Sequence, residues 1–215
     1  MKKPADPKSD KMDKTERYEA VARAVLSIVH LHGVDSVTHS RISRIAKVSR
    51  AWLYKYVGSS REKIMSFAAD HMGALFTDLG PAQPELSREQ WFKEIGARFL
   101  KILEMTERFP NVPRVYFQHR ATHGLLGRRL EKVAQRLRDR EVTELTAIFG
   151  MSSSQAERVS EILSAVRMGL AHSFAPTPLP EEAVKRTLRN TAPQQMVQLL
   201  ERLARASVDE VLSRP

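Results

Sequence analysis

The segment from Thr38 to Val57, THSRISRIAKVSRAWLYKYV, constrains the fold more than any other part of the chain. Ile42, Ile45 and Ala46 have the three- and four-residue spacing that places apolar side chains on one face of a short helix. Lys47-Val48-Ser49 then interrupts the pattern, because serine is a favoured N-cap and the valine before it can fill the angle between two helices. The segment therefore predicts two short helices about a tight turn.

The second helix of this pair is predicted to begin at Arg50, with Leu53 and Val57 turned inward. Its outward positions combine cations with aromatic side chains, and they are Arg50, Ala51, Trp52, Tyr54, Lys55 and Tyr56. Exposed aromatics are unusual on an ordinary surface, but beside cations they suit phosphates, sugars and base edges. We therefore predict a helix-turn-helix whose second helix lies in the major groove of DNA.

The distribution of charge agrees with an anionic partner. The 215-residue chain has a formal net charge of +10, and residues 1 to 65 hold fourteen Lys and Arg against seven Asp and Glu. Between Arg41 and Lys63 there are seven bases, and Glu62 is the single acid. A solvated basic face is the alternative interpretation, but its coincidence with the helix-turn-helix pattern favours nucleic acid.

This region resembles the TetR family of bacterial repressors over about residues 15 to 66. The matching residues are Gly33, Thr38, Ile42, Ala46, Val48, Ser49, Ala51, Leu53, Tyr54, Tyr56, Arg61 and Glu62. There are two departures. Lys47 stands where the family usually has a turn glycine, at a cost of about 1 kcal/mol if the left-handed backbone is kept. One extra residue lies in Gly58-Ser59-Ser60, so Ser60, Arg61 and Lys63 are alternatives for the family's phosphate-contacting position.

The predicted DNA-contacting residues divide into three groups. Arg50 and Ser49 are expected to read base edges, and Ala51 and Trp52 to make apolar contact with thymine methyl groups or sugars. Phosphates are expected to be held from both helices and from the start of the next one, by Tyr54, Tyr56, Lys55, His39 and Arg61. Ser40, beside His39 at the start of the first helix, completes the predicted interface.

The flanking segments complete an N-terminal DNA-binding domain. Residues 1 to 14 contain two prolines and alternating charges, and we expect a disordered basic arm. Thr15 to His32 has a helical apolar spacing that Gly33 ends, and Ser60 to Leu79 forms a further helix. Gly80-Pro81 breaks the pattern. We therefore predict a DNA-binding domain at 15–66 with a connecting helix to 79, and a second domain at 81–215.

The second domain shows no strand signal, so the predicted fold class is all-α. One helix is predicted to start with a capping box between Ser87 and Gln90, and another with Ser154 and Glu157. Pro110 and Pro113 are expected to break the chain between helices. The remaining predicted helices run from Arg114 to His123, Leu125 to Phe149, Glu181 to Arg189 and about Pro193 to Leu212.

The resemblance implies two functions for this second domain. In the family the last two long helices of each chain form a dimeric four-helix bundle, here Ser154 to Phe174 and Pro193 to Leu212. The family also places a small-molecule pocket among its middle helices, although core packing is the alternative for any single aromatic residue there. The candidate ligand-binding residues are Trp91, Phe99, Tyr116, Phe117, His119 and His123, together with Ile95 and Phe109.

Other functional classes lack their signals in this sequence. His119 and His123 share a predicted helix face and could chelate a metal, but no third ligand is nearby, so no metal site is predicted. The absence of cysteine fits a reducing cytoplasm, and no signal peptide or membrane span is expected. Phosphate-binding loops and nucleophile motifs are also missing, so we expect neither an enzyme nor a cofactor.

The sequence therefore predicts a homodimeric transcriptional regulator, a repressor that a small-molecule effector releases from a palindromic operator in double-stranded DNA. Two alternatives stay open. One is an architectural protein that binds DNA without sequence preference, which the same charge would serve. The other is a ligand-responsive interaction protein without operator binding, which the lysine in the turn and the bulky Trp52 would fit.

Overall fold

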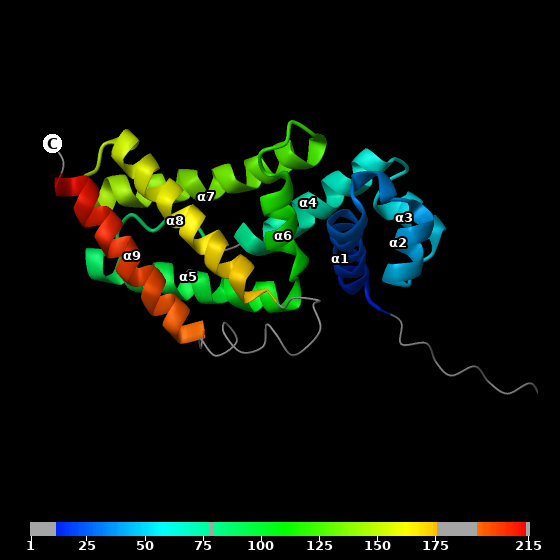
Figure 1. Ribbon diagram of the computed structural model, residues 1–215, viewed down its shortest axis with the longest axis horizontal. Helices are drawn as coiled ribbons and strands as arrows, with labels where there is room; N and C mark the ends of the chain where they lie inside the picture. The colour runs from blue at the N-terminus through cyan, green and yellow to red at the C-terminus, as the bar shows by residue number, and fades with distance from the viewer. Residues whose placement is uncertain (1–11, 78–79, 176–192, 214–215) are drawn as a thin grey trace, which may run out of the picture. The chain divides into compact units, whose positions relative to one another are not determined.

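The protein is all-helical, as predicted. The computed structural model describes residues 12–77, 80–175 and 193–213, and the regular structure within these ranges consists of α-helices and one short 3-10 helix. The chain divides into two compact units, Met1–Met72 and Gly73–Pro215. Helix α4, Arg61–Thr77, begins in the first unit and ends in the second. Figure 1 shows the order of the helices along the chain.

The first unit is a small helical domain. It contains α1 (Lys14–His32), the 3-10 helix η1 (Val34–Ser36), α2 (His39–Ala46), α3 (Arg50–Tyr56) and most of α4. Apolar side chains recur at three- and four-residue spacing along α1, and they form a core with residues of the other helices. Its fully buried members include Val21, Ala22, Ile42, Leu53, Ile64 and Ala68.

The start of α1 corrects the predicted extent of the N-terminal arm. The Asp13 carboxylate accepts a hydrogen bond from the Glu16 amide at 2.8 Å, and Glu16 in turn accepts from the Asp13 amide at 2.9 Å. This capping box satisfies two backbone donors at the helix end. The prediction that the arm extends to residue 14 is therefore wrong at its end, because Asp13 and Lys14 belong to the helix start. Residues 1–11 lie outside the described residues.

The second unit is a bundle of longer helices. They are α5 (Arg88–Arg108), α6 (Asn111–His119), α7 (Leu125–Phe149), α8 (Ser153–Phe174) and α9 (Pro193–Ser213). Helix α9 packs against α5 and α8, and α7 packs against α8 (Figure 1). The predicted helix from Glu181 to Arg189 lies outside the described residues.

The predicted capping box at the start of α5 is confirmed, but that of α8 lies elsewhere. The Ser87 hydroxyl accepts from the Gln90 amide, and the Gln90 side chain accepts from the Ser87 amide. At α8 the box joins Ser152 to Gln155, not Ser154 to Glu157. Ser152-Ser153-Ser154-Gln155 also fits the capping pattern, and only Met151 separates it from Gly150, the C-cap of α7.

Helix α6 begins earlier and ends earlier than predicted. It starts at Asn111, so Pro113 lies in its first turn, where a missing backbone N–H removes no helical hydrogen bond. It ends at His119, and Arg120 donates its backbone N–H to the Tyr116 carbonyl. The predicted helix from Arg114 to His123 is therefore wrong at both ends, and His123 lies outside the helix.

Candidate nucleic-acid interface

Helices α2 and α3 form the predicted helix-turn-helix. The Thr38 hydroxyl caps α2 by accepting from the Arg41 amide at 3.3 Å, and the Ser49 hydroxyl caps α3 by accepting from the Trp52 amide at 3.1 Å. Leu53 of α3 and Ile42 of α2 are completely buried, and Val48 between the helices is also buried. The inward residues thus fix α3 against the domain and leave its other side available.

One apolar position of α2 does not face the core. Ile45 has 48 % of its surface exposed, whereas Ile42 and Ala46 are buried. The prediction that all three share the buried face is therefore wrong for Ile45. A helix of this length presents only a narrow stripe to α1 and α3, and Ile42 and Ala46, four residues apart, occupy it.

The turn between the helices keeps a left-handed residue. Lys47 has φ 54° and ψ 37°, so a lysine adopts the conformation that glycine holds most easily. Ser43 stabilises the turn, because its hydroxyl donates to the Val48 carbonyl at 2.6 Å and its carbonyl accepts from the Val48 amide at 3.2 Å. The side chain of Lys47 is exposed.

The outward side of α3 presents cations and tyrosines. Arg50, Ala51, Lys55 and Tyr56 are exposed, and Tyr54 has 53 % of its surface exposed. The Tyr54 ring stacks on the His39 imidazole, with centroids 4.2 Å apart and planes inclined by 14°. His39 Nε2 lies 2.9 Å from the Gly58 carbonyl oxygen. These contacts hold Tyr54 in a fixed orientation, with its hydroxyl-bearing ring at the surface.

Trp52 has different surroundings from those expected. It is half-buried, with its ring centroid 5.4 Å from that of Tyr18 on α1 and 5.2 Å from that of Tyr56. Tyr18 also lies 5.3 Å from Phe67 of α4. The prediction that Trp52 faces entirely outward is therefore only partly right, because its ring joins a row of aromatics that runs from α3 across α1 to α4.

His71 stands at the α4 end of this aromatic row. Its ring stacks on Phe67 at 5.5 Å, and its buried Nε2 atom has no hydrogen-bond partner among the described residues. Burial lowers the pKa of His71 below its ordinary value, and the negative charge of Glu19 opposes this shift. The neutral imidazole is the form that this site favours.

The three alternatives for a phosphate-contacting residue, Ser60, Arg61 and Lys63, lie at the start of α4 and are exposed. The Ser60 hydroxyl accepts from the Lys63 amide at 3.2 Å and so caps the helix. Arg61 Nη1 lies 2.7 Å from Asp35 Oδ1, and the Arg61 side chain is 47 % and the Asp35 side chain 99 % exposed. Such a surface ion pair contributes little stability and can exchange for a phosphate. Ser40 is exposed at the start of α2.

The candidate ligand-binding residues fall into two groups in the second unit. Trp91 and Phe99 of α5 are completely buried. The second group, Tyr116, Phe117 and His119, lies on α6. The ring centroids of Phe117 and His172 of α8 are 5.3 Å apart, and the Arg120 guanidinium lies over the rings of Tyr116 and Phe117. Burial lowers the pKa of His119, whereas His123 is exposed in the loop after the helix.

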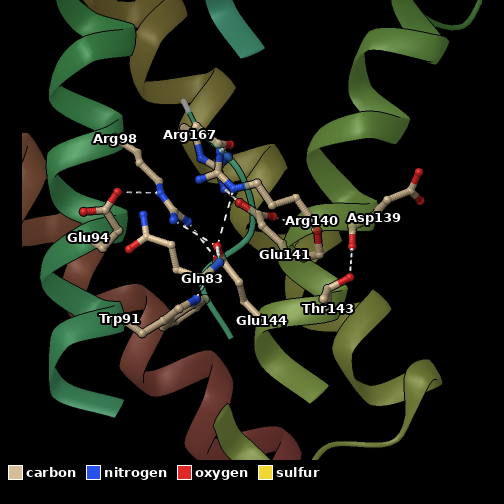
Figure 2. A network of polar contacts seen from close by, with 12 residues as sticks. Gln83, Trp91, Glu94, Arg98, Asp139, Arg140, Glu141, Thr143, Glu144 and Arg167 are labelled. Atoms are coloured by element: carbon tan, nitrogen blue, oxygen red, sulfur yellow. Dashed lines mark hydrogen bonds and ion pairs between the residues drawn. The ribbon is translucent and has the colours of Figure 1, made fainter. Parts of the chain in front are cut away.

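Trp91 belongs to a buried polar network. Its Nε1 donates to Glu144 of α7 at 3.0 Å, and Arg98 donates to both oxygens of the same carboxylate at 2.7 and 2.9 Å. The backbone amide of Gln83 donates a further hydrogen bond to the Glu144 carboxylate at 3.0 Å (Figure 2). Burial alone would raise the pKa of Glu144, but Arg98 and the other donors lower it below its ordinary value.

A second buried ion pair lies beside this network. Glu141 of α7 accepts a hydrogen bond from Arg167 of α8 (Figure 2). It also accepts one from the Ser160 hydroxyl at 2.7 Å. Sequence reasoning missed both acids. The sequence does contain a pattern that indicates their burial. Glu141 and Glu144, three residues apart, fall on the same side of α7 as the buried Ala134 and Leu145.

No helix within the described ranges is both long and apolar enough to cross a membrane. No group of three or more His, Cys, Asp or Glu side chains in the same ranges is placed to hold a metal ion.

Comparison with known proteins rests on structure alone, since no protein-family model and no curated protein matches the chain. A TetR-like transcriptional regulator from Rhodococcus sp. RHA1 superposes with a TM-score of 0.65 at 17 % identity, over 93 % of this chain and 99 % of that one. The chain has the TetR fold. A TetR protein from Streptomyces coelicolor shares the TetR fold at a TM-score of 0.51 and 16 % identity, over 92 % of this chain and 99 % of its own.

A further transcriptional regulator from the same Rhodococcus strain has a TM-score of 0.57 at 18 % identity, with 91 % of this chain and 95 % of that chain covered. At these identities the likeness establishes the TetR fold and assigns no ligand or DNA sequence. The coverage extends well beyond residues 15 to 66, the part of the sequence that resembles the TetR family. The TetR fold therefore includes the second unit as well as the helix-turn-helix.

Proposed function

We propose that this protein is a homodimeric, sequence-specific DNA-binding transcriptional regulator that acts as a repressor in the cytoplasm. The observation that carries the proposal is the exposed side of α3, which presents Arg50, Tyr54 and Lys55 to the surface. Ser49 caps this helix, and the buried Leu53 fixes it against the domain. In a helix-turn-helix such a helix enters the major groove. The TetR fold supports this proposal, since the solved regulators named above share it.

The exposed residues of α3 suggest a division between base and phosphate contacts. Arg50 and Ser49 at the N-terminal end of α3 would read base edges, and Ala51 would contact a thymine methyl group. Tyr54, Lys55 and His39 would hold phosphates, and Arg61 would exchange Asp35 for a phosphate. Trp52 would contribute through its exposed edge while its ring supports α3 from within, against Tyr18.

Apolar side chains on α8 and α9 support the proposed dimer. Ile162 has 44 % of its surface exposed, and Leu199 and Leu203 have 36 % each. Leu199 and Leu203 are four residues apart and so share one face of α9, which packs beside α8. A second copy of the chain would cover these side chains and place two recognition helices about one DNA turn apart, roughly 34 Å.

We propose that a small molecule bound in the second unit releases the operator. The candidate residues nearest the surface are Tyr116, Phe117, His119 and His123 of α6 and its following loop, and Trp91 and Phe99 are the buried candidates. Because α4 is shared by the two units, its displacement would move the DNA-binding helices. The ligand must bind one arrangement of the heads more tightly than the other.

Selection of bound duplexes from a random pool tests this function. A dimeric regulator should enrich a palindromic site and prefer it to random DNA by about 10³ or more. Binding without enrichment would instead identify an architectural protein. If no duplex is retained, and the DNA upstream of the protein's own gene is not bound in a gel shift, DNA binding is excluded. An interaction protein then becomes the better hypothesis.

A further inference from the structure

Lys47 carries a backbone cost that the free protein does not recover. It is the single non-glycine residue with positive φ in the described part of the chain. A side chain at this conformation costs about 1 kcal/mol relative to glycine, because the Cβ approaches the following carbonyl. Strain that persists at one residue of a folded domain suggests a function for its side chain.

The surrounding turn prevents Lys47 from relaxing. Its backbone N–H donates to the Ser43 carbonyl, which also accepts from the Val48 amide at 3.2 Å. The Ser43 hydroxyl fixes the Val48 carbonyl at 2.6 Å, and the Val48 side chain is buried. The left-handed conformation is therefore imposed by the turn, and glycine would satisfy the same hydrogen bonds without strain.

The Lys47 side chain adds no stabilising contact to the fold. It is exposed and forms no hydrogen bond or ion pair among the described residues. The neighbouring charges on Arg44 and Arg50 are also positive and exposed, and Glu62 is the single acid between residues 41 and 63. Lys47 therefore carries an exposed charge that no described acid pairs, in a stretch that is otherwise basic, and an anion brought by a partner would pair it.

The place of Lys47 in the domain identifies that anion. In a helix-turn-helix the first helix crosses the DNA backbone and the N-terminal end of the second enters the groove, so the turn between them lies at the phosphate-lined groove edge. We propose that Lys47 binds a DNA phosphate beside the base-reading end of α3. This inference rests on the proposed function and adds a phosphate contact in the turn itself.

Variants of Lys47 separate its effect on stability from its effect on binding. In Lys47→Gly the midpoint of denaturant unfolding should rise, because the strain is removed, while affinity for the selected operator falls roughly tenfold for a dimer. The slope of log affinity against log salt should become shallower by about 0.9 for each head. Lys47→Asn, which tolerates the left-handed conformation without a charge, should lose the same affinity.

Two further variants serve as controls. Lys47→Arg keeps the charge and should retain both the affinity and the salt slope, and Lys101→Gln removes an exposed charge from α5 and should change neither. Unchanged affinity and slope in Lys47→Gly and Lys47→Asn would overturn the inference while leaving the proposed function intact. Failure of the unmodified protein to bind any duplex would instead overturn the proposed function itself.

Discussion

Trp52, Tyr54 and Tyr56 of α3 have three different surroundings. Tyr54 stacks on His39 at the surface, Tyr56 lies beneath the Lys14 and Lys55 ammonium groups, and Trp52 packs on Tyr18. The sequence predicted an outward aromatic surface because Leu53 had to face inward. It did not predict the position of Trp52, since this depends on Tyr18, a residue far away in sequence whose helix packs beneath α3.

Arg50 and Lys55 should differ in how their loss affects DNA binding. Arg50→Ala should weaken the cognate site by about 1 to 3 kcal/mol and relax base preference, because a base-edge contact is lost. Lys55→Ala should weaken all sequences alike and flatten the salt dependence. Gel-shift titrations on the selected site and on single-base variants of it measure both effects. An unchanged base preference in Arg50→Ala would contradict the assignment of Arg50 as a base-reading residue.

Glu144 should be a main contributor to stability of the second unit. Arg98 has two carboxylate partners, the buried Glu144 at 2.7 Å and the partly exposed Glu94 at 2.8 Å. Glu144→Gln removes the buried partner and leaves Arg98 only Glu94, so we expect the free energy of unfolding to fall by about 3 kcal/mol. The Glu94 side chain, which pairs with Arg98 from the same helix, is 30 % exposed, so Glu94→Gln should cost about 1 kcal/mol or less. Chemical denaturation measures the difference, and equal losses in the two variants would refute the ranking.

The Glu144 carboxylate should also make the protein less stable at acid pH. The pKa of Glu144 is lowered in the folded protein from an ordinary value of 4.5. Its stabilising contribution is therefore complete above pH 4.5 and is lost as the pH falls through the folded pKa. Wild-type unfolding free energy should drop in this range, and Glu144→Gln should show a smaller drop.

At the level of helices, His71 of α4 should make the stability of the protein depend on pH. Burial keeps the pKa of His71 below 6.5, with Glu19 opposing, so the unfolded chain binds a proton more readily below that pH. The unfolding temperature should therefore fall between pH 7.5 and pH 5.5, and His71→Gln should lose part of this fall. His123→Gln, in an exposed loop, is the control and should keep it. Circular dichroism melts at both pH values give the comparison.

Helix positions followed from sequence where the signals were local. Gly33 ends α1, Ser49 caps α3, and α7 runs from Leu125 to Phe149 as predicted. Errors arose where two local signals competed, as at Ser152 and Ser154, or where proline occurs in a first turn, as at Pro113. Glu144 and Glu141 of α7 bind side chains of other helices. Periodicity within one helix does not indicate which residues of another helix it contacts.

For the whole molecule, the proposed dimer makes α9 the sensitive element. Leu203→Glu introduces a charge into the apolar face with Leu199, so it should dissociate the dimer and abolish cooperative operator binding. Sedimentation at several protein concentrations measures the change of mass. Leu31→Glu, at an even more exposed leucine of α1, should remain dimeric, and a dimeric Leu203→Glu variant would move the interface elsewhere.

The sequence contains two tryptophans, and each unit holds one of them. Trp52 touches two tyrosine rings in the first unit, whereas Trp91 donates to a carboxylate in the second. Their fluorescence should therefore differ, and Trp91→Phe or Trp52→Phe would leave an emission signal from one unit at a time. The emission of such a single-tryptophan variant would show whether binding of DNA or an effector to one unit changes the environment of the tryptophan in the other.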